Sequence, residues 1–176
     1  FLPPGDGPHP VVIDGDDCWR SVTEEILREL IRRGCALALF NRTEIMPDAI
    51  GTFRDCALAR AEPEKDYRAI SAWAWGYHRC VDVLTRDERV DPRRIVATGH
   101  SRGGKTALLA GATDERIALV NPNNAGAGGS GCFRYHNPGS ETLANGGPVR
   151  HSFWYAARLR EWVGREQDLP IDLHQL

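Results

Sequence analysis

Ser101 lies in a short run of residues whose order could support nucleophilic chemistry. The segment Gly99-His100-Ser101-Arg102-Gly103 fits the pattern G-x-S-x-G, in which a tight turn from a strand into a helix exposes a serine hydroxyl. Side chains at the two glycine positions would clash in such a turn. The hydroxyl would stand at the helix N-terminus, where the helix dipole and the next backbone N–H favour a developing oxyanion. The segment therefore predicts that Ser101 is a nucleophile.

The same residues also satisfy a second pattern. Residues 99–106 fit G-x-x-x-x-G-K-[ST], the phosphate-binding P-loop, in which Lys105 and Thr106 would contact a nucleotide and its magnesium. A P-loop enzyme also needs an acidic residue at the end of a neighbouring strand. The apolar run 117–120 ends instead at Asn121, and the only apolar run that ends in an acid, at Asp14, precedes the motif. A P-loop nucleotide-binding domain and a turn without chemistry stay open as alternatives.

The residues around this motif alternate between predicted strands and predicted helices. Apolar runs predict strands at residues 11–13, 35–40, 95–98 and 117–120, the last of them ended by Pro122. Helical spacing of apolar residues predicts helices at 21–34, 68–86 and 105–112, the first opened by a capping box of Ser21 and Glu24. Residues 41–64 show no clear periodicity and are predicted to be a long surface excursion. This order predicts an α/β fold with a mainly parallel sheet and helices on both faces.

Composition excludes several other classes of protein. The 176 residues carry 22 Lys+Arg and 24 Asp+Glu, a formal charge of −2, so nothing indicates a nucleic-acid or membrane partner. A neutral or small-molecule partner fits better. No apolar run approaches the roughly 20 residues of a membrane helix, and no signal peptide or initiator Met opens the sequence, so the natural N-terminus is expected to be missing. The five cysteines form no CxxC pair, at least one is expected to be a free thiol, and we expect no metal site and no cofactor.

A series of segments along most of the chain carries a family pattern. They are FNRT (40–43), AISAWAWG (69–76), GHSRGGKTAL (99–108), DERIAL (114–119), NNAGAGG (123–129), ET (141–142), FW (153–154) and LPIDLH (169–174). In this order they resemble the bacterial branch of carbohydrate esterase family fifteen, the glucuronoyl esterases, together with related acetylxylan esterases. The resemblance implies an α/β-hydrolase fold of which residues 1–176 form a single partial domain, without its first and last strands.

The resemblance also implies an activity and roles for individual residues. The family cleaves esters of a glucuronic acid unit on plant-cell-wall glucuronoxylan, such as 4-O-methyl-glucuronoyl methyl esters, which implies acyl transfer to Ser101 and then to water. Arg102 matches the oxyanion-hole position and Lys105 the lysine that holds the sugar, while Glu141 is a candidate sugar contact. Members are commonly exported, which suggests a secreted or periplasmic bacterial protein. The sequence indicates no oligomeric state.

Departures from the family pattern concern the rest of the catalytic triad. Where characterised members have the triad Glu after the next strand, this sequence has Asn124, and an amide cannot stabilise an imidazolium as a carboxylate does. Because α/β-hydrolases run Ser, acid, His along the chain, the acid and the base are expected beyond Leu176. His174 falls upstream of the family's catalytic histidine, His100 is expected to pack beneath the turn, and His136 and His151 are weak candidates. The 176 residues alone are therefore expected to be nearly inactive, and a noncatalytic carbohydrate-binding relative is the third alternative.

Aromatic residues could form a sugar-stacking platform, but their helical spacing favours a place in the core for most of them. The set consists of Trp73, Trp75, Phe153, Trp154 and Trp162.

Overall fold

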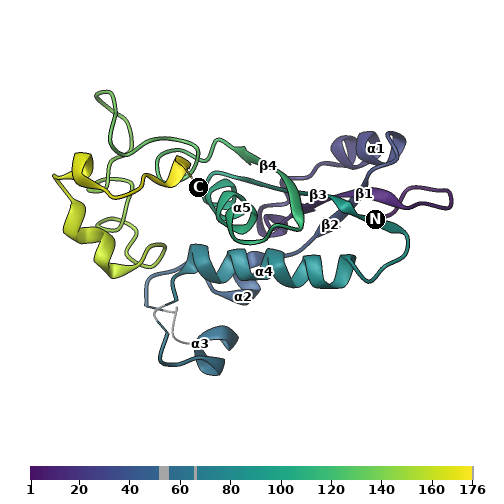
Figure 1. Ribbon diagram of the computed structural model, residues 1–176, viewed down its shortest axis with the longest axis horizontal. Coiled ribbons are helices and arrows are strands. Elements are labelled where there is room, and N and C mark those ends of the chain that lie inside the picture. The colour runs from purple at the N-terminus through teal and green to yellow at the C-terminus, as the bar shows by residue number, and fades with distance from the viewer. Residues whose placement is uncertain (52–55, 66, 176) are drawn as a thin grey trace.

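A parallel sheet forms the centre of the protein. The computed structural model describes residues 1–51, 56–65 and 67–175. Its four strands are β1 (His9–Asp14), β2 (Ala36–Leu39), β3 (Val90–His100) and β4 (Ile117–Asn123), in the order β2-β1-β3-β4. Each neighbouring pair is parallel, as the sequence predicted, so all four strands end at the same edge of the sheet (Figure 1).

Helices connect the strands and lie on both faces of the sheet, as predicted. They are α1 (Glu24–Arg32), α2 (Arg42–Ile45), α3 (Ala57–Ala61), α4 (Ala69–Leu84) and α5 (Arg102–Thr113), with short 3-10 helices at Asp17–Trp19, Ala157–Trp162, Glu166–Asp168 and Leu173–Gln175. Helix α1 lies on one side of the sheet and α4 on the other (Figure 1). None of the helices in the described part of the chain combines the length and apolar character that crossing a membrane requires.

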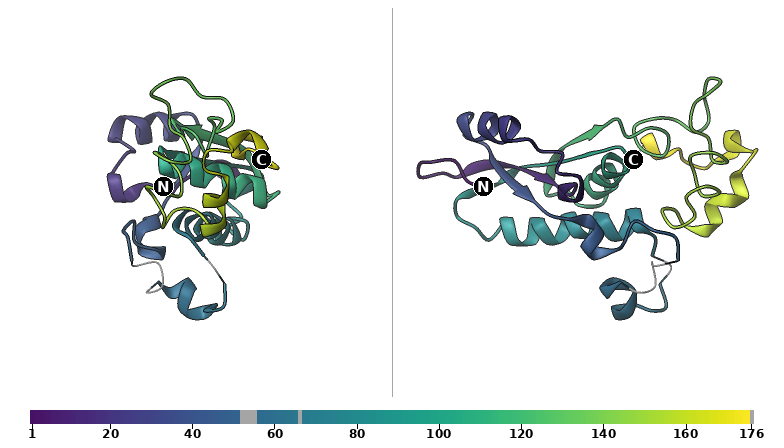
Figure 2. Two further views of the ribbon diagram at one scale, coloured as in Figure 1. Left: turned by 90° about the vertical axis from the view of Figure 1, so that its left-hand side faces the viewer. Right: turned by 180° about the vertical axis from the view of Figure 1, so that it is seen from behind.

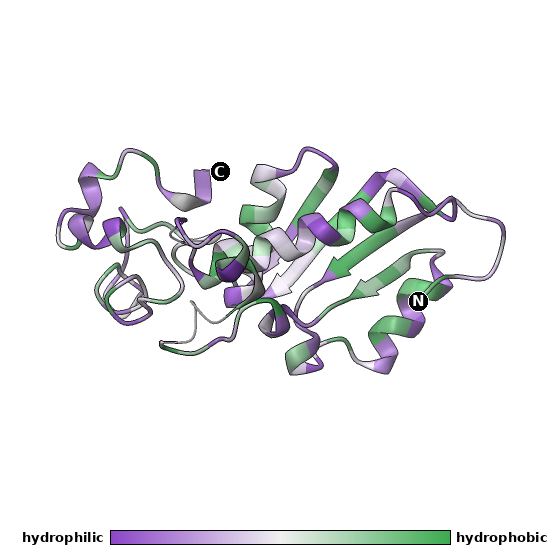
Figure 3. Ribbon diagram, turned by 90° about the horizontal axis from the view of Figure 1, so that it is seen from below, coloured by the Kyte–Doolittle hydropathy of each residue, from purple (hydrophilic) through white to green (hydrophobic). Residues whose placement is uncertain are grey.

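One face of the sheet carries the larger core. Val11, Ile13, Ile95 and Ala97 are fully buried on this face and belong to one cluster with apolar residues of α4 and α5. The alternation of side chains along each strand sends Val12 and its neighbours to the opposite face. In Figure 3 the strands are mostly coloured as hydrophobic, which fits their position between helices.

The opposite face is covered by α1 over only part of its width. A groove of about 520 Å³ runs between α1 and β4, lined among others by Ile26, Val96 and Leu119. Leu119 is 56% exposed and Ile26 47% exposed, so this side of the sheet is less well packed than the side under α4 and α5.

The segment after β4 lies at one end of the molecule, next to the start of α4 (Figure 2). Backbone hydrogen bonds from Ala69 N–H to the Phe153 carbonyl (2.8 Å) and from Ile70 N–H to the Trp154 carbonyl (3.4 Å) attach it there. Trp73, Phe153 and Trp154 are buried together in a second apolar cluster, as predicted, whereas Trp75 is 38% exposed.

Two local predictions were wrong, and one segment contains helices that its sequence did not indicate. Pro122 does not end the last strand, because β4 continues to Asn123 with Pro122 opposite Gly99. The strand lies at the edge of the described sheet, where the missing N–H of a proline removes no ladder hydrogen bond. Helix α1 is capped by Thr23, whose Oγ1 accepts from Ile26 N–H (3.3 Å), and not by Ser21. The excursion at 41–64 contains the short helices α2 and α3.

Candidate active site

Ser101 occupies the single position between a strand and a helix. Strand β3 ends at His100 and α5 begins at Arg102, so Ser101 makes the whole turn, with φ 54° and ψ −118°. A positive φ is uncommon for a residue with a side chain and marks a strained turn. The Ser101 N–H donates to the Asn123 carbonyl at the end of β4 (2.9 Å). The chain therefore holds Ser101 at the N-terminus of α5, as a nucleophile elbow requires.

The two glycines of the motif are required by space. A Cβ on Gly99 would lie 2.5 Å from the Gly103 carbonyl oxygen, and a Cβ on Gly103 would overlap the carboxylate of Asp16. The predicted clash at both positions is confirmed, and at Gly103 the obstacle is a side chain from the loop after β1.

The loop after β1 lies next to Ser101, between two strands, β1 and β3, whose following connections run to opposite sides of the sheet. The chain leaves β1 through α1 toward β2, and it leaves β3 through α5 toward β4, on the other side. In parallel α/β sheets the crevice at such a switch point is the usual ligand site. The Asp16 carboxylate accepts from the His100 backbone N–H (2.6 Å) and so joins the β1 loop to the residue before Ser101.

A buried ion pair lies behind the elbow. Arg42, at the start of α2, pairs with Asp16, and both side chains are fully buried. The guanidinium of Arg42 also lies over the rings of Trp19 (4.2 Å) and Trp73 (4.7 Å). Burial raises the pKa of Asp16, and the charge of Arg42 acts in the opposite direction. Removing either partner would leave the other charge buried and uncompensated. The pair joins the loop after β1 to the start of α2.

Arg102 lies at the opening of this crevice. Its Nη1 donates to Asp48 Oδ2 (2.7 Å), and its guanidinium lies over the ring of Trp154 (4.5 Å) and near that of Trp19 (5.4 Å). A third of its side chain is exposed. The residue after the nucleophile thus presents both a backbone N–H at the helix N-terminus and a partly exposed cation.

Lys105 is held by the glycine-rich loop after β4. Its ammonium donates to the carbonyls of Ala125 (2.5 Å) and Ala127 (2.6 Å) and to Glu141 Oε2 (3.2 Å). The Lys105 side chain is 3% exposed, whereas Glu141 is 48% exposed. Burial lowers the pKa of Lys105, and the charge of Glu141 acts in the opposite direction. The two predicted sugar-contact residues are therefore brought together as an ion pair.

This geometry does not suit a P-loop. A P-loop needs several backbone N–H groups between strand and helix to surround phosphate oxygens. Here Ser101 alone separates β3 from α5, so no such loop lies between the strand and the helix.

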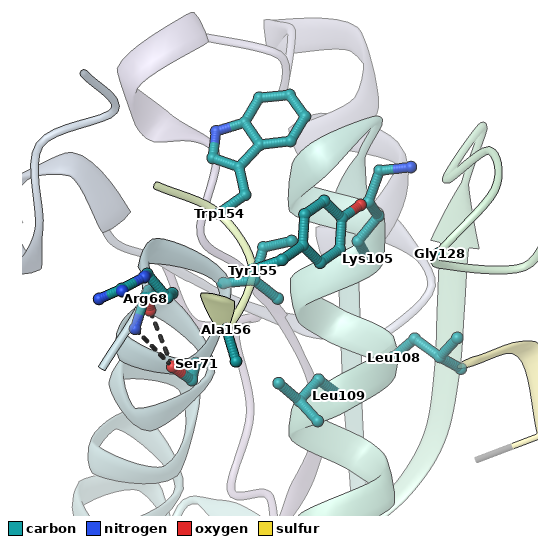
Figure 4. Close-up of a pocket in the computed structure, with 10 residues that line it drawn as sticks. Arg68, Ser71, Lys105, Leu108, Leu109, Gly128, Trp154, Tyr155 and Ala156 are labelled. Atoms are coloured by element: carbon teal, nitrogen blue, oxygen red, sulfur yellow. Dashed lines mark hydrogen bonds between the residues drawn. The ribbon is translucent and has the colours of Figure 1, made fainter. Parts of the chain in front are cut away.

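A cavity of about 170 Å³ adjoins Lys105. It is lined by Arg68 and Ser71 at the start of α4, by Lys105 and Leu109 of α5, and by the segment 154–156 (Figure 4). Tyr155 contributes a buried hydroxyl without a hydrogen-bond partner among the described residues. Burial raises the pKa of Tyr155. Most of this wall is apolar.

Comparison with known proteins decides the family. A family model described as "Glucuronyl esterase, fungi" matches residues 2–176. The chain belongs to the glucuronyl esterase family. It is 33% identical over 183 aligned residues to a 4-O-methyl-glucuronoyl methylesterase of Podospora anserina, an alignment that covers 99% of this chain and 37% of that protein.

Solved structures of glucuronoyl esterases share the fold. A carbohydrate esterase family fifteen enzyme of Teredinibacter turnerae superposes with a TM-score of 0.82 at 26% identity, over 99% of this chain and 47% of that one. An alanine variant of the Sporotrichum thermophile enzyme, solved with methyl 4-O-methyl-β-D-glucopyranuronate, gives 0.74 at 27% identity, over 98% and 47%. The fold is that of an α/β-hydrolase, as predicted, and the chain spans less than half the length of these relatives.

Asn124 follows β4, at the position where the family resemblance places the triad glutamate. It is exposed and adopts a left-handed conformation, with φ 47°. The preceding residue, Asn123, accepts the Ser101 N–H, so the end of β4 adjoins the elbow in this glucuronyl esterase family member.

The histidines do not complete a triad in the described part of the chain. Within residues 1–51, 56–65 and 67–175, no hydrogen bond joins the Ser101 hydroxyl to a histidine ring. His100 does not pack beneath the elbow as expected, because it continues the alternation of β3 on the α1 face, where it is exposed and lines the groove. His174 lies near Asp172 (3.6 Å), and His151 stacks on Trp154 (3.8 Å between ring centroids).

Three side chains of metal-ligand type come together in the C-terminal segment, which their sequence spacing did not indicate. The ligand atoms of Cys132, Asp172 and His174 lie within 4.8 Å of one another. Asp172 Oδ2 already accepts hydrogen bonds from the Cys132 thiol (3.0 Å) and from the backbone N–H of Phe133 (2.8 Å) and Arg134 (2.9 Å). These bonds give the carboxylate a role in fixing the loop at 132–134.

Sequence reasoning did not single out Asp16, Arg42 and Asp48. Asp16 could have been found, because it follows a buried strand at the edge where sites are built. Arg42 lies in one of the segments that resemble the family. Asp48 had no such signal, since it belongs to the aperiodic excursion.

Proposed function

We propose that this protein is a serine carboxylic ester hydrolase that cleaves 4-O-methyl-glucuronoyl esters of plant-cell-wall glucuronoxylan through an acyl-enzyme on Ser101. The observation that supports this most directly is the strained elbow, which leaves Ser101 alone between β3 and α5. Membership of the glucuronyl esterase family supports the same chemistry. The relative from Podospora anserina is named for this activity.

In the proposed reaction the Ser101 oxygen attacks the ester carbonyl, and the alcohol leaves as the acyl-enzyme forms. Water then attacks the acyl group and releases the uronic acid. Negative charge develops on the carbonyl oxygen in both steps. In this proposal the Arg102 backbone N–H, at the N-terminus of α5, and the Arg102 guanidinium, at the opening of the crevice, would stabilise this charge.

The sugar ring would be bound by Lys105 and Glu141. All donors of the Lys105 ammonium are used, and its longest bond, 3.2 Å, goes to the half-exposed Glu141. A sugar hydroxyl could donate to the Glu141 carboxylate, or accept from Lys105 by displacing that carboxylate. The bonds to the two carbonyls would keep the ammonium in place during this exchange.

We place the triad acid and the histidine base in parts of the natural protein outside these 176 residues. The amide of Asn124 cannot replace a carboxylate beside an imidazolium, and α/β-hydrolases run Ser, acid, His along the chain. Residues 1–176 would then form the central part of one α/β-hydrolase domain. Because xylan is a polymer outside the cell, we also propose that the protein is exported.

Hydrolysis of methyl 4-O-methyl-glucuronate by the full-length protein tests this proposal. Wild type should release methanol, and Ser101→Ala should lose at least about a thousandfold in kcat, since removing a triad member leaves only the contribution of binding and the oxyanion hole. Ser21→Ala, at an exposed serine in front of α1, is the matched control and should keep full activity. Turnover that survives Ser101→Ala would contradict the proposal.

A further inference from the structure

Asp48 joins two residues that flank the crevice. Its Oδ2 accepts from Arg102 Nη1 (2.7 Å), and its Oδ1 accepts from the indole N–H of Trp154 (2.9 Å). The Asp48 side chain is 14% exposed. One carboxylate thus uses both oxygens to hold the residue after the nucleophile and an aromatic residue more than fifty positions further along the chain.

The guanidinium of Arg102 has few other attachments. Its Nε is buried and has no hydrogen-bond partner among the described residues. The remaining contacts are the rings of Trp154 and Trp19, which constrain the plane of the guanidinium but not its rotation within that plane. Asp48 is therefore the directional contact that sets where the N–H groups of Arg102 point.

Asp48 itself is attached to the buried ion pair behind the elbow. Arg42 Nη2 lies 3.7 Å from Asp48 Oδ2, and Arg42 pairs with Asp16, which binds the His100 N–H. Cations and anions alternate along this row, which runs from Arg102 through Asp48 and Arg42 to Asp16. The row begins at Arg102, directly after Ser101, and ends at Asp16, which binds the backbone N–H of His100, directly before Ser101.

We infer that Asp48 is a positioning residue for the proposed esterase, which orients the Arg102 guanidinium toward the developing oxyanion and holds Trp154 beside it. This inference rests on the proposed function. Asp48 does not touch the reacting atoms and acts through Arg102.

Removing the charge of Asp48 has two opposed effects. The positive potential at Arg102 would rise, which favours an oxyanion, but the charge-assisted bond that orients the side chain would be lost. Such bonds are roughly twice as strong as neutral ones, and catalysis by oxyanion donors depends on preorganised geometry. We expect the loss of orientation to dominate.

The test uses Asp48→Asn in the full-length protein with a methyl glucuronate ester. We expect kcat to fall about 10- to 100-fold, while KM changes less than about threefold. This loss is smaller than the roughly 100- to 1,000-fold that follows removal of an oxyanion donor, because the donor is misoriented and not removed. Asp48→Glu, which keeps the charge, should recover part of kcat. Asp87→Asn is the control, because it breaks an exposed pair with Arg89 just before the start of β3, at the opposite end of that strand from Ser101.

A double-mutant cycle separates positioning from a general structural role. In an Arg102→Ala background, Asp48→Asn should cost little further kcat, whereas a merely structural effect would lower activity in both backgrounds alike. Thermal melting of each variant records any unfolding. Equal kcat for wild type and Asp48→Asn, or equal losses in both backgrounds, would overturn the inference. Absence of Ser101-dependent turnover in wild type would instead overturn the proposed function, and the inference with it.

Discussion

Ser101 adopts its strained conformation because the neighbouring backbone leaves no alternative. Strand β3 and helix α5 are both fixed by packing, and the Asn123 carbonyl holds the Ser101 N–H. Strain of this kind costs about 1–3 kcal/mol and persists only where the surroundings impose it. The glycines that permit the turn should therefore be among the least replaceable residues of the protein.

Gly103→Ala tests this constraint. The added Cβ would overlap the Asp16 carboxylate, which is fixed by Arg42 and by the His100 N–H, so it cannot move without breaking the buried pair. We expect a loss of about 3 kcal/mol or more in the free energy of unfolding, because overpacking and damage to a buried pair add. Urea denaturation measures this loss.

Gly139→Ala provides the matched control for the same substitution. Gly139 has φ 89° and nothing within 4 Å of an added Cβ, so only backbone strain of about 1–2 kcal/mol is expected there. Equal losses for the two variants would show that the contact with Asp16 does not matter.

At the scale of elements, the residue that caps the start of α1 differs between the sequence pattern, which favoured Ser21, and the structure, which shows Thr23. Thr23 has extended backbone angles and its side chain accepts from Ile26 N–H, which satisfies one of the free donors in the first turn. Thr23→Ala should lower the free energy of unfolding by about 1 kcal/mol. Ser21→Ala, at the position that the sequence pattern favoured, should change it by less than about 0.5 kcal/mol, the usual range for a surface substitution. Denaturant curves of the two variants would contradict this assignment if their order were reversed.

The sequence indicated element types better than element ends. The run 95–98 is mostly apolar because one of its faces is buried under α4 and α5 and the other is half-buried, and this signal is local. Strand β3 nevertheless extends from Val90 to His100, and β4 continues through Pro122, because pairing with neighbouring strands depends on residues far away in the chain. The residue types within one segment therefore cannot predict with which strands it pairs or where the pairing ends.

At the scale of the whole molecule, some residues of the site are close together because they are neighbours in the sequence, and others because the chain folds. Ser101, Arg102 and Lys105 share one helical turn, so their proximity follows from sequence spacing. Asp48 and Trp154 meet only because the excursion after β2 and the segment after β4 fold against the same end of α4 and α5. Their contact with Arg102 is a property of the tertiary structure.

The ionisation of Asp14 should make the free energy of unfolding depend on pH. This residue ends β1, is 6% exposed, and accepts from the Asp16 backbone N–H (2.6 Å). Burial, together with the nearby charge of Asp16, raises the pKa of Asp14 to about 6. An unfolded aspartate titrates near pH 3.9, so between about pH 4 and pH 6 the unfolded chain releases a proton that the folded protein still binds.

Because the unfolded state binds fewer protons in this window, Asp14 lowers stability as the pH rises through it, by about 3 kcal/mol for a shift of roughly two units. Below about pH 4 the contribution is fully favourable, and above about pH 6 it is lost. Asp14→Asn keeps an oxygen that accepts from the Asp16 N–H but cannot ionise. Relative to wild type, this variant should therefore gain about 2–3 kcal/mol between pH 4 and pH 7 in urea denaturation. Asp6→Asn, at an exposed aspartate, should run parallel to wild type, and a parallel course for Asp14→Asn would show that the carboxyl of Asp14 is not held neutral in the fold.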